Sequence, residues 1–103
     1  MGKYVLAYRG GTMAATEAEQ AAAMQQWIGW FGELGAAVVD GGNPFGASVL
    51  VGADGGVSAA GASALTGYSI VTADSVDAAA TLAKGCPVLG SGGSVEVYEA
   101  LDM

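Results

Sequence analysis

Apolar and polar residues alternate along the chain in patterns that separate strands from helices. The segment 3–9 is rich in strand formers and is apolar on both faces: Tyr4, Leu6 and Tyr8 alternate with Val5 and Ala7. Such a pattern is typical of an inner strand that is covered on both sides. We therefore predict a central strand over 3–9.

A helix is predicted over residues 16–34. Thr16 and Glu19 form a capping box, in which a hydroxyl and a carboxylate satisfy free amide groups at a helix start, and Gly35 is a natural C-cap. Its inward stripe follows the helical spacing of apolar residues, namely Ala21, Met24, Ile28 and Phe31, with Trp27 and Leu34 on one shoulder. Trp30 falls beyond that shoulder, so its ring needs a partner or a ligand.

The rest of the chain divides into further strands and a second helix. Strands are predicted over 36–40, 47–51, 67–73 and 94–100, with a bend at 41–46, a tight turn at 53–56 and a poorly patterned strand extension and loop at 57–66. The second helix begins at Asp74 or Ser75 and ends at Gly85-Cys86-Pro87, because proline cannot continue the hydrogen-bond ladder. Its predicted buried stripe is Val76, Ala79, Leu82 and Ala83.

This order of elements predicts one α+β domain over residues 1–103. We expect a ferredoxin-like antiparallel sheet with two helices on one face. A chain of 103 residues fits a single domain.

A low charge content suggests association. Charged residues make up 13% of the chain, against about 25% in a typical soluble protein. A lone copy would therefore leave much uncharged surface in water, and contiguous apolar patches usually mark interfaces. We predict a homodimer.

The balance of charge excludes other partners. Ten acidic residues face three basic ones, for a net charge of −7, so we expect neither nucleic-acid binding nor attraction to anionic membranes. No apolar run approaches the roughly 18 residues of a membrane span, and the apolar stretch near residue 1 is too short for a signal peptide. A single cysteine cannot form an internal disulfide, which favours a cytoplasmic location.

Six ordered segments are similar to a known family. They are 3–8 (KYVLAY), 39–46 (VDGGNPFG), 65–71 (LTGYSIV), 73–75 (ADS), 83–87 (AKGCP) and 92–99 (GGSVEVYE). Together they resemble the YCII-related (DGPF-like) proteins along essentially the whole chain. The resemblance implies a dimeric α+β barrel, in which two ferredoxin-like subunits pack their open sheet faces together.

The resemblance does not supply catalytic residues. In some branches of the family a helix histidine with a nearby aspartate has been proposed as an active site, and relatives act on muconolactone-type small molecules. This chain has no histidine, and Met24 and Cys86 stand near the two positions. The dyad is therefore not carried over.

Composition excludes several kinds of chemistry. Without histidine there is no Ser-His-Asp or Cys-His pair, and scattered carboxylates with one cysteine do not make a zinc site. The glycine-rich segment 90–93 lacks the lysine and the helix of a phosphate loop, and we interpret it as a tight turn. Cys86, at a helix C-terminus, is interpreted as a buried packing thiol. We expect no cofactor and no metal.

The remaining candidates are one carboxylate and a group of rings. Asp40 is either a general base at a pocket mouth or a carboxylate that binds the backbone of the bend. The rings of Tyr8, Trp27, Trp30, Phe31 and Tyr68 form either solid core or the wall of a pocket between the first helix and the sheet. In the pocket interpretation, Tyr8, Trp27, Phe31 and Tyr68 bind the ligand.

Two functional hypotheses follow. The first is an enzyme-like or small-molecule-binding domain for a small, mainly apolar compound, with cofactor-independent proton transfer or isomerisation by carboxylate and tyrosine groups. The second is a non-catalytic dimeric binding or regulatory module. The ring cluster favours the first, and the absence of histidine favours the second.

Overall fold

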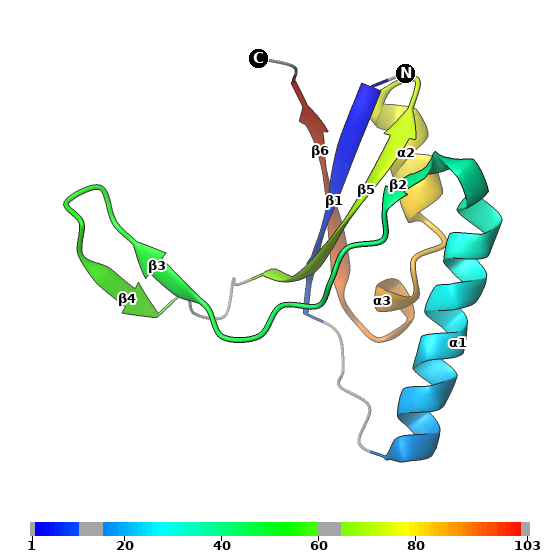
Figure 1. Cartoon of the computed structure of the whole chain (residues 1–103), viewed down its shortest axis with the longest axis horizontal. Helices are drawn as coiled ribbons and strands as arrows, with labels where there is room; N and C mark the ends of the chain where they lie inside the picture. Colours follow the sequence, from blue (N-terminus) through cyan, green and yellow to red (C-terminus); the bar gives the residue numbers. More distant parts are fainter. Residues whose placement is uncertain (1, 11–15, 60–64, 102–103) are drawn as a thin grey trace.

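The structure, a computed structural model, describes residues 2–10, 16–59 and 65–101 (Figure 1). Its elements in chain order are β1 (Gly2–Arg9), α1 (Glu17–Leu34), the 3-10 turn η1 (Gly35–Ala37), β2 (Val38–Asp40), β3 (Val49–Val51), β4 (Val57–Ala59), β5 (Leu65–Ala73), α2 (Val76–Ala83), α3 (Pro87–Gly90) and β6 (Ser94–Ala100). The predicted α+β class is confirmed.

A four-stranded antiparallel sheet organises the molecule. Its strand order is β2-β5-β1-β6, while β3 and β4 pair with each other in a separate hairpin. The helices cover one face of the sheet (Figure 1). The side chains of β1 and β5 on the helix-covered face are buried. They are Tyr4, Leu6, Tyr8, Ser69, Val71 and Ala73. The predicted central position of β1 is thus confirmed.

Both predicted ends of α1 are confirmed. The Thr16 hydroxyl accepts a hydrogen bond from the backbone N–H of Glu19 at 3.1 Å, and Gly35 ends the helix with a φ of 55°. Here the side-chain cap satisfies an amide that the first turn leaves without a helical partner.

The predicted inward stripe of α1 is wrong by part of a turn. Met24 and Ile28 are 64% and 56% exposed, whereas Trp30 is 4% exposed and its indole N–H donates to the carbonyl of Leu82 at 3.2 Å. Turning the helix this way brings both tryptophans, the largest apolar side chains of the helix, against the rest of the fold. Trp30 thereby finds the partner that its position required.

Several elements also differ from the sequence predictions in their bounds. The residues before Val38 form a 3-10 turn, and β3 begins two residues later than expected. The segment 57–66, in which a strand extension and a loop are predicted, contains β4, and β5 begins at Leu65. Pro87 not only follows the end of α2 but also begins the short helix α3, because its fixed φ suits a first helical position.

The bend after β2 lies directly against β5. Pro44 bridges to Gly67, and the N–H of Phe45 donates to the carbonyl of Thr66 at 2.9 Å. Gly42 has a φ of 75°, and a Cβ at this position would lie 1.7 Å from the carbonyl oxygen of Tyr68. Only glycine fits here.

Gly42→Ala is expected to lower the free energy of unfolding by at least about 2 kcal/mol, because a positive φ and a backbone clash add together. The matched control is Gly46→Ala in the same bend, where a Cβ meets no atom within 4 Å. The control should stay within about 0.5 kcal/mol of the wild type in urea unfolding. Equal effects of the two variants would contradict this account of the bend.

Candidate ligand-binding site

A cavity of about 670 Å³ opens between α1, the adjoining ends of β1 and β5, and the bend. Ligand sites in proteins usually measure about 300–1,000 Å³ and are mostly apolar. Trp27 and Phe31 line this cavity from α1, and Tyr8 lines it from β1. All four residues that the sequence predicted as ligand-binding, including Tyr68, border this one cavity.

Three of these rings form a continuous aromatic wall. Tyr8 and Trp27 meet edge to face with ring centroids 5.2 Å apart, and Trp27 and Phe31 lie 5.9 Å apart. Such pairs stabilise beyond the area they bury, by about 0.5–1.5 kcal/mol each. The wall is therefore held in shape by ring contacts within the chain.

Tyr68 contributes differently from the other three rings. Strand alternation turns its side chain to the sheet face opposite Ser69, which is fully buried on the helix side. Its ring stacks on Phe45 with centroids 5.6 Å apart and an angle of 22°. Tyr68 thus borders the cavity where the bend crosses the strand, and it fixes Phe45 there.

A chain of buried hydroxyl groups connects the aromatic wall to the bend. The Tyr8 hydroxyl donates to Ser69 Oγ at 2.7 Å, and the Ser69 hydroxyl donates to the carbonyl of Gly41 at 2.7 Å. Burial raises the pKa of Tyr8 far above that of an exposed tyrosine, so its phenol is protonated at neutral pH. Sequence reasoning missed Ser69. The available signal was that it is the one polar residue on the inward register of β5.

Asp40 is not among the described residues that line the cavity. Its carboxylate is on an exposed residue and accepts a hydrogen bond from the N–H of Gly42 at 2.8 Å. This is the backbone-binding role that the sequence left as one of two alternatives. The general-base role stays a prediction, without a described contact to the cavity.

Cys86 is buried between α2 and α3, with 3% of its surface exposed. Burial raises the pKa of its thiol to about 11, although hydrogen bonds with the Val88 backbone and the Tyr8 side chain act in the opposite direction. A thiol with this pKa is protonated at neutral pH and is a poor nucleophile. Its environment agrees with the predicted packing role, although Cys86 occupies the N-cap position of α3 as well as following α2.

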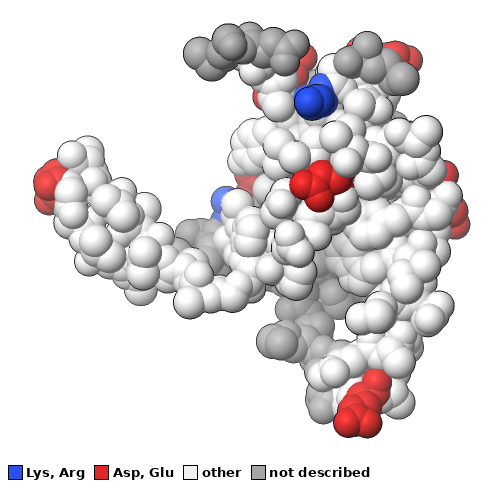
Figure 2. Space-filling view, viewed as in Figure 1, with Lys and Arg blue, Asp and Glu red and all other residues white. Residues whose placement is uncertain are grey.

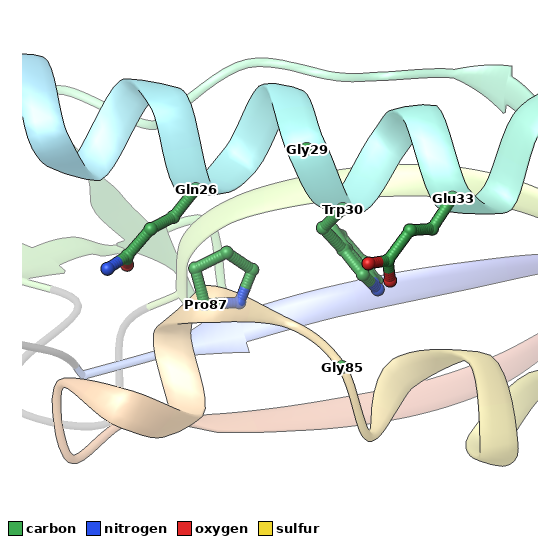
Figure 3. Close-up of a pocket in the computed structure, with 6 residues that line it drawn as sticks. All are labelled: Gln26, Gly29, Trp30, Glu33, Gly85 and Pro87. Atoms are coloured by element: carbon green, nitrogen blue, oxygen red, sulfur yellow. The ribbon is translucent and has the colours of Figure 1, made fainter.

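A second, smaller hollow lies on the other side of α1 (Figure 3). It measures about 300 Å³ and is open. Gln26 and Glu33 reach from α1 toward the connection at Gly85 and Pro87, with Trp30 pointing down between them. Because the Trp30 N–H already donates to Leu82, this hollow offers a ligand less than the larger cavity does.

No family model matches the chain, and no curated protein matches it. The resemblance to YCII-related proteins therefore stays a prediction. Within the described ranges, no group of three or more histidine, cysteine, aspartate and glutamate residues is arranged to hold a metal ion. No helix in these ranges is long and apolar enough to cross a membrane.

Ser69→Ala should lower the free energy of unfolding by about 1–3 kcal/mol, because it leaves the buried Tyr8 hydroxyl without this acceptor and the Gly41 carbonyl without this donor. In a double-mutant cycle with Tyr8→Phe, the combined loss should be clearly smaller than the sum of the single losses. Additive losses in urea unfolding would show that the two hydroxyls do not act as one unit.

Stability should fall between about pH 9 and pH 11, because the unfolded chain ionises Cys86 near its usual pKa of 9.0 while the folded thiol holds its proton to about 11. The folded state is the better proton binder, so this contribution is complete below pH 9 and lost above pH 11. Cys86→Ala should remove at most about 2–3 kcal/mol of the fall. Identical pH profiles of unfolding free energy for both proteins would contradict the assignment.

Proposed function

We propose that this protein is a small-molecule-binding domain whose cavity receives an uncharged, planar and largely apolar compound. The observation that carries the proposal is the cavity of about 670 Å³ with its wall of Tyr8, Trp27 and Phe31. Flat aromatic faces of this kind favour a ligand that stacks or packs edge to face.

The residues that line the cavity support an uncharged ligand. No aspartate, glutamate, lysine or arginine occurs among the described residues that line the cavity. A charged ligand there would lose its hydration without meeting an opposite charge, which is costly. The polar side chains that line the cavity carry amides and hydroxyls, including those of Gln20, Asn43 and Thr66. They suit a carbonyl or hydroxyl substituent.

Binding is better supported than proton transfer. Tyr8 keeps its proton at neutral pH and so serves as a hydrogen-bonding group rather than a base. The Asp40 carboxylate is engaged by the backbone of the bend. Proton transfer or isomerisation is the second candidate, and the observation in its favour is the hydroxyl chain from Tyr8 to Ser69 at the cavity wall.

We also infer a ferredoxin-like subunit that dimerises through its open sheet face in the cytoplasm, as the resemblance to YCII-related proteins implies. The strand order β2-β5-β1-β6 with helices on one face supports the subunit fold. On the other face, Ile70, Val5 and Tyr98 are cross-strand neighbours and form an apolar row. A second open face would cover that row.

The ligand class can be tested with 2-naphthol and 2-naphthoate, which differ mainly in charge at pH 7. Calorimetry should show 2-naphthol binding at least about tenfold more tightly, because the naphthoate carboxylate loses hydration in the cavity. Ala23→Phe, which places an extra ring in the cavity, should weaken binding of 2-naphthol at least about tenfold. The matched control Ala22→Phe, at an exposed position of the same helix turn, should leave it unchanged. Tighter binding of the naphthoate would contradict the proposal.

If the protein is a homodimer, light scattering at micromolar concentration should give a mass of about twice the 10.0 kDa chain mass. Ile70→Lys on the open face should lower that mass to one chain, because the interface would then bury a charged ammonium group in place of an apolar side chain of the row. A wild-type monomer at these concentrations would contradict the dimer but not the ligand site.

A further inference from the structure

The β3–β4 hairpin extends away from the body of the molecule, on the side of the sheet that the helices leave open (Figure 1). Its strands pair Val49 with Ala59, Leu50 with Ser58 and Val51 with Val57. Side chains of directly paired residues lie on the same face of a ribbon, and successive residues alternate. One face of the hairpin is therefore wholly aliphatic: Val49, Val51, Val57 and Ala59.

This aliphatic face is in water in the single chain. Val49, Val51 and Val57 are 67%, 61% and 67% exposed. A two-stranded hairpin is at best marginally stable by itself, and neither β3 nor β4 pairs with another of the described strands. Leaving such a face uncovered is costly, so the hairpin needs a surface to pack on.

The hairpin carries almost no charge. Asp54, at its tip, is the one charged residue between 41 and 59, and its carboxylate accepts the N–H of Gly56 within the turn. Figure 2 shows the hairpin white along its length and red only at its end. Two chains of net charge −7 repel each other elsewhere, so an uncharged arm is where they can meet at least cost.

The exposed area is large enough for an interface. The chain exposes 6780 Å², against about 5,200 Å² for a compact monomer of 10.0 kDa. Its radius of gyration is 14.9 Å, against about 13 Å for a compact domain of this length. The excess of about 1,500 Å² exceeds the roughly 800 Å² that each partner buries in a standard interface.

We propose that the β3–β4 hairpin is an arm that clasps a second copy of this chain through its aliphatic face. The arm and the open sheet face lie on the same side of the molecule (Figure 1). A two-fold axis that brings two open faces together therefore carries each arm alongside the partner's body, and the contact is reciprocal. The proposal rests on the dimer inferred above and adds the arm to its interface.

The arm can be tested with a pair of neighbouring substitutions on the same strand. Val57→Glu places a charge on the aliphatic face, and the matched control Ser58→Glu places the same charge on the opposite face. Both residues are exposed in the single chain, so neither change should affect folding, which circular dichroism checks. The dimer dissociation constant, from light scattering over a dilution series, should rise about tenfold or more for Val57→Glu and less than about twofold for Ser58→Glu. Val49→Glu is a second variant on the aliphatic face and should behave like Val57→Glu.

The outcomes separate the arm from the dimer itself. A wild-type chain that is monomeric at 100 µM, about the upper range of such a series, would overturn both proposals. If Val57→Glu and Val49→Glu keep the dissociation constant of the wild type while Ile70→Lys dissociates the dimer, the arm proposal is overturned. The dimer through the open sheet face then stands. Equal weakening by Val57→Glu and Ser58→Glu would overturn the assignment of the aliphatic face.

Discussion

A serine hydroxyl buried in the middle of β5 ties three distant parts of the chain together. Ser69 is fully buried, accepts from the Tyr8 hydroxyl on β1 and donates to the Gly41 carbonyl in the bend. The Tyr8 and Ser69 hydroxyls are buried and would be costly to leave without a partner. The sheet therefore reaches its stable arrangement with the bend drawn against it, and that arrangement leaves the cavity between the bend and α1. The cavity is therefore a consequence of the hydrogen bonds that satisfy polar groups in the core.

Local signals in the sequence predicted the ends of elements well. The Thr16 cap, the Gly35 stop and the turn around Gly55 each depend on a few adjacent residues, and the structure has all three. The direction in which α1 faces depends instead on what the helix packs against. Apolar spacing favoured Met24 and Ile28, but the Leu82 carbonyl and the space beside Gly85 accept the Trp30 ring. Spacing along one helix contains no information about that partner.

The site shows the same division between local and distant causes. Large rings near a strand end were enough to predict that Tyr8, Trp27 and Phe31 come together, because few places in a small fold hold them. The face on which Tyr68 lies and the role of Ser69 depend on strand register. Register in turn depends on pairing between segments some 60 residues apart, such as Tyr8 and Gly67.

The position of Gly42 also constrains how this protein can change over evolutionary time. No side chain fits between the bend and the Tyr68 carbonyl, so the bend wall cannot be altered at that point without losing its path along β5. The α1 side of the cavity is different. Gln20, Ala23 and Met24 lie at the edge of the cavity and are exposed or partly exposed, so their packing constrains substitution less than that of Gly42. The size and polarity of the cavity can therefore change by substitution on one side while the other side stays fixed, which lets a single scaffold diversify without refolding.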